Sequence, residues 1–182
     1  MSPLGAQIAY IGGRLQSEIW SMGANGENPR KLLQAGLGDR FLQLQWSPDG
    51  NRIAYIKLHT DEEKSQTAIE TVPVSGGVGL TMLAGPSLGS FWWCSDNRII
   101  YSAVEAESNS GDMNLWQIRV DKTGRRVSTP KRITTWAGVS LLDLSASTDG
   151  KRLMVVKAGF QRDLYVAEVS KNRMLGTPRR FT

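Results

Sequence analysis

The sequence predicts an all-β fold in which one antiparallel unit of four strands occurs four times along the chain. Three blocks of sequence lead to this prediction: a turn motif with glycine, a strand with a large aromatic residue, and a strand that usually begins with two basic residues. The blocks keep the same order in every copy. Self-similarity with a period of a few tens of residues is typical of repeat architectures, so the chain is predicted to be one repeat array.

The turn motif is clearest at 46–56, where the sequence reads WSPDGNRIAYI. It returns in three other places: 1–11, 93–102 and 146–156. The copy at the start begins inside the motif, with Met1 at the position of Trp46. Because glycine accepts a positive φ, Asp49-Gly50 is predicted to form a two-residue hairpin turn between two strands.

The aromatic strand and the closing strand follow the turn motif in step. The apolar anchors of the aromatic strand are 50, 46 and 49 residues apart, at Ile19, Ile69, Leu115 and Leu164. The closing strand lies at 29–33, 79–83, 130–134 and 178–182. Each block is a short run of alternating or continuous apolar residues between turn formers, which is a strand signal.

The unit is therefore a four-stranded antiparallel meander of the size of one β-propeller blade. We name its strands A to D: A precedes the Asp-Gly turn, B follows it, C carries the aromatic residue and D closes the unit. The four predicted blades occupy 1–35, 36–84, 85–135 and 136–182, and the first lacks its inner strand A. A single blade cannot bury both faces, so we expect neighbouring blades to pack face to face through Trp20, Trp116 and Tyr165.

The blocks Trp-Ser-Pro-Asp-Gly-x-x-Ile-Ala-Tyr, Ile-Trp-x-Met and Pro-Arg-Lys-Leu resemble the WD-repeat-like blades of the TolB family and of prolyl oligopeptidase relatives. The resemblance covers essentially the whole chain and implies a β-propeller. Blades of this kind serve scaffolds, gating domains of peptidases and sensor domains, so the resemblance implies a fold rather than one function. Such propellers usually close with six or seven blades, whereas this chain shows four. The array is thus expected to have two open ends.

The composition is that of an ordinary globular chain, with 40% hydrophobic and 21% charged residues. A single cysteine, Cys94, excludes an intramolecular disulfide and is expected to be a small core or turn residue. The N-terminal residues lack the features of an export signal, and no window is apolar enough to span a membrane. The compartment stays open, although members of the resembled family are often periplasmic or extracytoplasmic.

The formal charge of +5 permits an acidic partner such as nucleic acid. The basic pairs, however, open the outermost strand of three blades: Arg30-Lys31, Lys131-Arg132 and Arg179-Arg180. Proline and positive charge on an outer strand protect a sheet edge against aggregation. We therefore predict that nucleic acid is not the partner.

The chain is predicted not to be an enzyme. The segment 85–89 matches the Gly-x-Ser-x-Gly pattern of a nucleophile elbow, but that motif needs a strand-turn-helix setting and a histidine after the serine. The only histidine, His59, comes before it. One histidine and one cysteine do not make a usual zinc site, and the acidic loops are predicted to be solvated, so neither a metal nor a cofactor is expected.

The B to C and D to A connections emerge on the side of each blade opposite the Asp-Gly turns, and they vary most among the copies. Variable loops on a rigid scaffold are where binding usually resides. The predicted binding residues lie in or beside these connections: Arg14, Arg40, His59, Glu62, Trp92, Glu105, Trp136 and Arg162. Arg40, Trp92 and Trp136 are also placed to reach a central channel, with blade packing as the alternative role of the tryptophans.

Together these patterns predict a non-enzymatic binding or scaffold module that presents its loops to a protein, a peptide or a small ligand. Open blade faces are unfavourable in water, so two copies are expected to associate as a homodimer in an eight-bladed ring. The alternative is a piece of a larger propeller, serving as the gating domain of a prolyl-oligopeptidase-like hydrolase or as the sensor domain of a kinase or transcriptional regulator.

Overall fold

The structure is a computed structural model that describes residues 1–61, 64–105, 112–147, 151–159, 164–167 and 177–181. The first repeat contains β1 (Gln7–Gly12), a short 3₁₀ turn η1 (Arg14–Gln16), β2 (Glu18–Gly23) and β3 (Arg30–Gln34). The second contains β4 (Asp39–Trp46), β5 (Arg52–Thr60), β6 (Ser65–Pro73) and β7 (Leu80–Gly85). The third contains β8 (Leu88–Trp93), β9 (Arg98–Val104), β10 (Met113–Arg119) and β11 (Lys131–Arg132). The fourth contains β12 (Val139–Ala146), β13 (Leu153–Gly159), β14 (Tyr165–Val166) and β15 (Arg179–Arg180).

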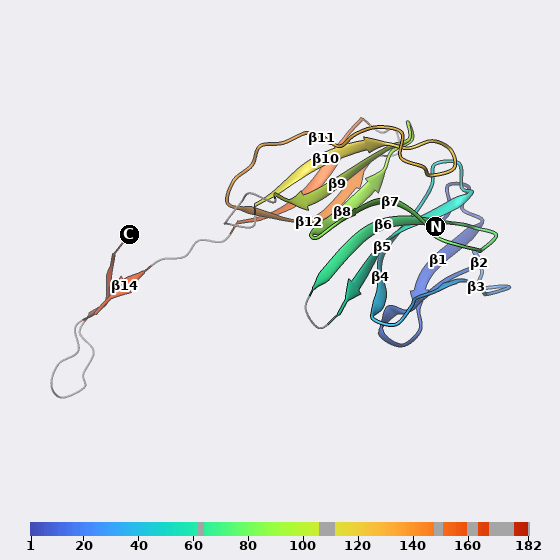
Figure 1. Cartoon of the computed structure of the whole chain (residues 1–182), viewed down its shortest axis with the longest axis horizontal. Coiled ribbons are helices and arrows are strands. Elements are labelled where there is room, and N and C mark those ends of the chain that lie inside the picture. Colours follow the sequence, from blue (N-terminus) through green and yellow to red (C-terminus); the bar gives the residue numbers. More distant parts are fainter. Residues whose placement is uncertain (62–63, 106–111, 148–150, 160–163, 168–176, 182) are drawn as a thin grey trace.

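These strands form antiparallel meanders, which we call blades one to four after their repeats. Blades two and three are four-stranded sheets in the orders β4-β5-β6-β7 and β8-β9-β10-β11, and blade one is a three-stranded sheet without strand A. Figure 1 shows the sheets of the first three repeats and the β12-β13 pair arranged side by side. The prediction of all-β propeller blades, with the first lacking its inner strand, is confirmed.

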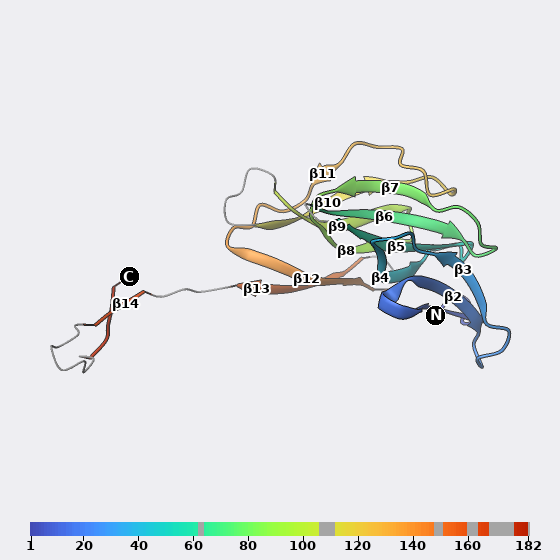
Figure 2. The same cartoon turned by 60° about the horizontal axis from the view of Figure 1, so that its bottom comes forward.

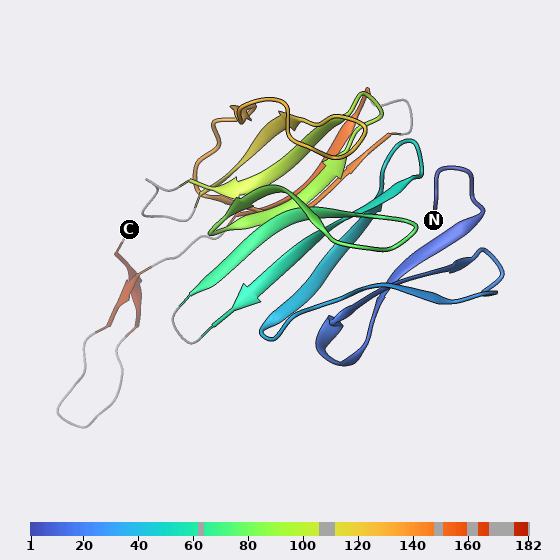
Figure 3. The same ribbon diagram turned by 45° about the vertical axis from the view of Figure 1, so that its right-hand side comes forward.

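The fourth repeat differs from the second and third. It has four strands in the predicted order, but β12 pairs only with β13, and β14 pairs only with β15. The β14–β15 hairpin lies apart from the other sheets in all three views (Figures 1, 2 and 3). A blade holds its outer strands against a neighbouring blade, and among the described residues β14 and β15 pair only with each other.

The turn between strands A and B is longer than the two-residue hairpin that the sequence predicts. In blade two the Gly50 N–H donates to the Ser47 carbonyl, and the Ser47 N–H donates to the Arg52 carbonyl at 2.8 Å. The Ser47 hydroxyl accepts the Arg52 N–H and donates to Asp49, so a side chain replaces one rung of the ladder. The same closing backbone bond recurs in the turns of blades one and four: Ser2 to Gln7 and Ser147 to Arg152.

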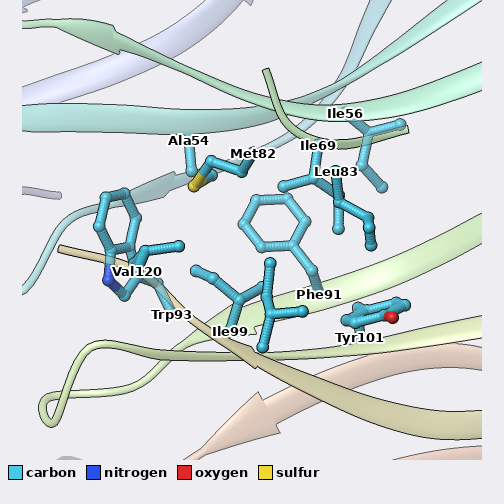
Figure 4. Packing of buried hydrophobic residues seen from close by; sticks show 11 residues of the cluster. Ala54, Ile56, Ile69, Met82, Leu83, Phe91, Trp93, Ile99, Tyr101 and Val120 are labelled. Atoms are coloured by element: carbon cyan, nitrogen blue, oxygen red, sulfur yellow. The ribbon is translucent and has the colours of Figure 1, made fainter. Parts of the chain in front are cut away.

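The core consists of separate apolar clusters between neighbouring blades. The cluster between blades two and three is centred on Phe91, which is packed among Ile69, Leu83 and Ile99 (Figure 4). A second cluster joins blades one and two, and includes Ile19, Leu32, Phe41, Trp46, Ile53, Tyr55 and Val72. The third, between blades three and four, has three buried members: Leu115, Leu141 and Leu144. Blades thus pack face to face as predicted, and the packing becomes thinner toward the fourth repeat. Of the three aromatic residues expected at these interfaces, however, Trp116 alone packs against such a cluster, whereas Trp20 lies on the outward face of blade one and Tyr165 is exposed.

Two glutamine side chains join the innermost strands β4 and β8. Gln43 accepts the Phe91 N–H at 3.2 Å and donates to the Phe91 carbonyl at 2.8 Å. Gln45 makes the same pair of bonds with Trp93, at 2.6 and 3.2 Å. Each amide therefore satisfies both backbone groups of one residue at the free edge of β8, which protects an edge strand that has no further strand beside it.

Equivalent positions differ in exposure according to whether another blade follows. Three anchors of strand C are buried and the fourth is not: Ile19 0%, Ile69 0%, Leu115 2% and Leu164 56% exposed. In strand B, Met154 and Val156 are 68% and 46% exposed, whereas the equivalent Ala54 and Ile56 of blade two are buried. The last apolar face of the array is therefore uncovered.

The opposite end of the array has an open face on blade one. Side chains alternate across a strand, so Trp20 lies on the face opposite the buried Ile19. Trp20 stacks on Tyr10 with ring centroids 6.4 Å apart, and its Nε1 donates to Glu18 at 2.8 Å. Lys31 lies 5.7 Å above the same indole. The outward face of blade one is thus aromatic, and the indole N–H of Trp20 on this face has a hydrogen-bond partner.

Candidate functional site

A polar crevice lies between blades one and two, at the loop ends of the strands. It consists of two adjoining cavities of about 340 and 320 Å³ that share Asp39, Lys57, Glu70 and Thr81. His59 lines the first cavity. The second is walled on the side of blade one by residues 33–36, which are the end of β3 and the start of the β3–β4 connection. A concave site with a few convergent polar groups is the usual form of a small-ligand site.

Strand alternation explains how these side chains come together. Ile53, Tyr55, Lys57 and His59 occupy one face of β5, the face toward blade one. The part near the Asp-Gly turn is apolar, since Ile53 and Tyr55 belong to the cluster between the two blades. Farther along, the face becomes polar at Lys57 and His59. The same interface is therefore filled by apolar side chains at its turn end and lined by ionisable side chains at its loop end.

Glu70 is the buried centre of the crevice. One of its oxygens, Oε1, accepts from Thr81 Oγ1 at 3.0 Å and pairs with Lys57 Nζ at 2.7 Å. The other, Oε2, accepts from the Tyr55 hydroxyl at 3.0 Å. Burial, reinforced by the Glu70 carboxylate, raises the pKa of Tyr55, so this phenol stays protonated as a donor. A buried carboxylate with three partners is held in a fixed position.

His59 is positioned by Asp39 on the neighbouring strand. The two residues are direct partners in the β4–β5 register, and His59 Nδ1 lies 2.6 Å from Asp39 Oδ1. A carboxylate at Nδ1 fixes the proton there, because an ionised carboxylate can only accept. Nε2 is then the ring nitrogen left for a ligand. The predicted binding residue His59 thus has an orienting partner that the sequence did not reveal.

The equivalent crevice between blades two and three is apolar. Its cavity of about 440 Å³ is lined mainly by aliphatic and aromatic side chains, including Leu83, Leu88, Tyr101 and Trp116. An ion pair lies at its edge, with Arg132 Nη2 2.6 Å from Glu105 Oε1. The predicted binding residue Glu105 is therefore engaged within its own blade, by a partner from strand D.

The two crevices differ at equivalent positions of the repeat. In strand C the residue after the anchor is Trp20 in blade one, Trp116 in blade three and Tyr165 in the fourth repeat, whereas blade two has Glu70. Trp20 Nε1 is bonded to Glu18, but the buried Nε1 of Trp116 has no partner among the described residues. Glu70 and Trp116 occupy the same position in strand C, and each pairs with the tyrosine of strand B in its own blade. The two crevices therefore differ in the side chain at this position and not in the backbone.

Trp136 and Glu105 are linked through the buried side chain of Asn114. Its Nδ2 donates to Glu105 Oε1 at 3.2 Å and to the Trp136 carbonyl at 3.1 Å. Its Oδ1 accepts the Trp136 N–H at 2.7 Å. The Trp136 ring packs at the interface of blades three and four, with Lys157 Nζ 4.6 Å from its centroid. The structure thus places Trp136 in blade packing.

Trp92 lies on the other side of the array. It lines a cavity of about 470 Å³ at the turn ends of the inner strands, together with Gln45, Trp46 and Ser47. Arg14 is exposed in η1, and Arg40 is exposed on β4. Glu62 and Arg162 lie outside the described residues. Of the six predicted binding residues that the structure describes, only His59 lines the polar crevice.

Sequence reasoning missed Asp39, Lys57 and Glu70. The signal for Glu70 is visible in the repeat, because it is the only acidic residue at a position that is otherwise aromatic. Lys57 follows the apolar run 53–56 on the same strand, and Asp39 opens β4. Their proximity depends on strand register, which a one-dimensional pattern does not give.

Three further predictions concern local chemistry. The Gly-x-Ser-x-Gly segment forms the tight connection between β7 and β8, a strand-turn-strand setting rather than the strand-turn-helix of a nucleophile elbow. Cys94 is buried, and burial raises the pKa of its thiol. Within the residues that the structure describes, no group of three or more His, Cys, Asp or Glu side chains is arranged to hold a metal ion. The described residues also contain no helix that is long and apolar enough to cross a membrane.

These features define a class of protein, an array of propeller blades with crevices between neighbouring blades. No protein-family model matches the sequence. No curated protein matches it in sequence either.

Solved structures with the same fold were found. TolB from Acinetobacter baumannii is 19% identical with a TM-score of 0.60, over 94% of this chain and 41% of that one. A puromycin-hydrolyzing peptidase from Mycobacterium tuberculosis is 16% identical with a TM-score of 0.62, over 97% of this chain and 29% of that one. The β-propeller domain of the Trilobed protease from Pyrococcus furiosus is 12% identical with a TM-score of 0.51, over 97% of this chain and 54% of that one.

The chain therefore has a TolB-like β-propeller fold and spans at most about half the length of these three structures. Identities this low establish the fold alone.

Proposed function

We propose that the chain is a non-enzymatic binding module that binds its ligand on the loop side and is completed to a closed eight-bladed ring by a second copy of itself. The observation that carries the proposal is the contrast between inner and terminal blade faces. Positions that are buried wherever a blade follows are exposed at Leu164, Met154 and Val156. Large apolar side chains that are exposed where their equivalents in the inner blades are buried indicate an interaction surface.

The two terminal faces correspond to the two sides of an inner interface between blades. The outward face of the fourth repeat corresponds to faces that contact a following blade, and the outward face of blade one corresponds to faces that contact a preceding blade. A head-to-tail contact between two copies would therefore repeat the arrangement of the inner interfaces. A contact of this type closes into a ring when the rotation per chain allows it, and two half-rings meet that condition.

Directional cross-linking tests this proposal. At the interface of blades two and three, Ala54 and Ile118 belong to one buried cluster. The equivalent positions at the open ends are Met154 and Met22. The double variant Met22→Cys, Met154→Cys is expected to form a covalent dimer on mild oxidation, because each cysteine would face its counterpart on the other copy.

The variant Met154→Cys alone is the matched control, and the buried Cys94 is present in both proteins. A covalent dimer from the double variant, with none from the control, supports the ring. An oxidised double variant that stays monomeric, or that forms a ladder of longer chains, contradicts it.

A second candidate is that this chain is part of a larger propeller that controls access to a peptidase or senses a ligand for a kinase or regulator. The fold match to the propeller domain of a protease favours it. The full reading frame discriminates the two candidates: an adjoining hydrolase or kinase domain would replace the homodimer proposal.

We further propose a protein, peptide or small-molecule ligand rather than nucleic acid. Basic residues on β3, β11 and β15 lie on outer strands, where positive charge protects the sheet edge. A filter-binding titration with DNA and RNA is expected to show no affinity that falls with added salt. A salt-sensitive affinity would instead indicate phosphate contacts.

A further inference from the structure

The polar crevice between blades one and two contains a buried carboxylate, Glu70, at a position that is aromatic in the other repeats, and burying this charge lowers the stability of the fold. Tryptophan is accommodated at the position of Glu70 in blades one and three, so the fold does not need a carboxylate there. Taking an ion pair out of water is expensive, and apolar replacements of buried pairs are often neutral or stabilising. A costly group that the fold does not require points to a role in binding.

The charges of the crevice are arranged in two layers. The carboxylates lie inside, with the Glu70 side chain 8% exposed and that of Asp39 18% exposed. The basic groups lie outside, with Lys57 32% and His59 43% exposed. Each basic group is therefore oriented from behind by its own carboxylate, which is how supporting side chains position ligand-binding groups.

The hydrogen bonds inside the crevice leave some polar groups of Lys57 and His59 for a ligand. Both Glu70 oxygens are occupied, by Tyr55, Thr81 and Lys57. Lys57 Nζ carries three donors and makes one ion pair, with Glu70. Nε2 of His59 has no partner among the described residues. The unused groups nearest the opening are therefore mainly donors from two basic side chains.

Lys57 and His59 are two residues apart on one face of β5, a separation of roughly 7 Å along the strand. A carboxylate group lying between them can accept from both, with one oxygen toward Lys57 Nζ and the other toward His59 Nε2. The adjoining cavity offers an apolar wall for the rest of the ligand, formed by Leu33, Ala35 and Phe41. The site thus combines an anion-binding pair with a small apolar surface.

We propose that this crevice binds a carboxylate carried on a small apolar body, with Lys57 and His59 as the binding residues and Glu70 and Asp39 as their positioning residues. Since Asp39 accepts from the Nδ1–H, a carboxylate at Nε2 is bound by the imidazole in which both ring nitrogens donate. The ionisable side chains lining the crevice are Asp39, Tyr55, Lys57, His59 and Glu70. The proposal rests on the proposed binding function, and it does not depend on ring closure.

The single histidine makes a direct test possible. His59 is the only histidine of the chain, so the proton on its Cε1 gives one isolated signal in an NMR spectrum. Addition of propionate is expected to shift this signal with a saturable curve, whereas propionamide, which has the same shape and no charge, leaves it in place. No saturable shift with propionate, or an equal shift with both compounds, would overturn the proposal.

Variants separate binding from structural damage. In Lys57→Met, Glu70→Gln the ammonium is removed without leaving a buried charge unpaired, and the propionate affinity is expected to fall about tenfold or more. The matched control is Lys157→Met, which changes the same charge at the equivalent position of the fourth repeat. Its affinity is expected to equal that of the natural sequence. Equal affinities of the double variant and the control, with both proteins folded, would exclude Lys57 as a binding residue.

Two sources of the carboxylate can be told apart. A tripeptide with a free C-terminus and the same tripeptide with an amidated C-terminus are titrated alongside propionate. Tighter binding of the free tripeptide than of propionate assigns the site to peptide C-termini, and the reverse order assigns it to small organic acids. If the His59 signal responds to none of these carboxylates, this proposal fails while the ring proposal still stands on its own cross-linking test.

Discussion

The interface between blades two and three and the exposed end of the fourth repeat are built from the same sequence pattern with opposite results. In the first, Phe91 and its neighbours form a dense core and all four strands of each sheet are paired (Figure 4). In the second, equivalent apolar residues are exposed and the repeat forms two separate pairs of strands. The strands of a blade are thus encoded locally, but their assembly into one sheet depends on a neighbouring blade.

The largest expected effect comes from truncating a strand C anchor at the two ends of this comparison. Ile69→Ala removes a fully buried side chain and is expected to lower the free energy of unfolding by about 2–5 kcal/mol. Leu164→Ala, at the equivalent exposed position, is expected to cost less than about 1 kcal/mol in the monomer. Urea unfolding of both variants measures the difference. Similar losses would show that the fourth repeat is packed as the inner blades are.

The glutamine side chains that join β4 to β8 are expected to contribute to the free energy of unfolding, whereas the equivalent residue of the fourth repeat is not. Gln45→Met keeps the length of the side chain but leaves the Trp93 backbone groups without their partners, at an expected cost of about 1–3 kcal/mol. Ser145→Ala changes the equivalent residue of the fourth repeat and is expected to have almost no effect on urea unfolding. A neutral Gln45→Met would mean that the β8 edge is satisfied in another way.

A smaller effect is expected at alkaline pH, through the tyrosines of strand B. Burial raises the pKa of Tyr101 to about 12. Because the unfolded chain loses this proton near pH 10, the contribution of Tyr101 is complete below about pH 10 and is lost as the pH rises toward 12. The expected loss is about 1–2 kcal/mol. In pH-dependent urea unfolding, Tyr101→Phe should remove the contribution of Tyr101 and leave that of Tyr55, whose pKa is also raised by burial.

The matched control for the alkaline transition is Tyr10→Phe on the open face of blade one. Its tyrosine is half-buried on a surface without a neighbouring blade. Removing it is expected to leave the alkaline part of the stability profile as it is in the natural sequence. A profile that changes in Tyr10→Phe and not in Tyr101→Phe would contradict the contrast between inner and terminal faces.

Most of the fold could be predicted because repeats encode it redundantly. Four copies of one pattern locate the strands, and the buried anchors Ile19, Ile69 and Leu115 are the ones that the spacing identifies. The length of the A–B turn was predicted wrongly, because the Ser47 hydroxyl replaces a backbone partner. The separate sheets of the fourth repeat were not predicted, since they depend on what lies next to it rather than on its own sequence.

The site was less predictable than the fold. His59 was identified from its loop position, but its partner Asp39 is twenty residues away and meets it through strand register. Glu70 departs from an aromatic position in the repeat, and only the structure shows that Lys57 and Thr81 satisfy it. Repeats reveal what is common to the blades, whereas binding chemistry resides in the departures from the pattern.

The mass of the chain in solution tests the central claim most directly. Light scattering over a range of protein concentrations is expected to give twice the 20.0 kDa of one chain, because the two open faces cover each other in a closed ring. Mass should stop increasing at that value, since a closed ring leaves no face open. A stable mass of 20.0 kDa across the same concentrations, or growth without a limit, would contradict the ring.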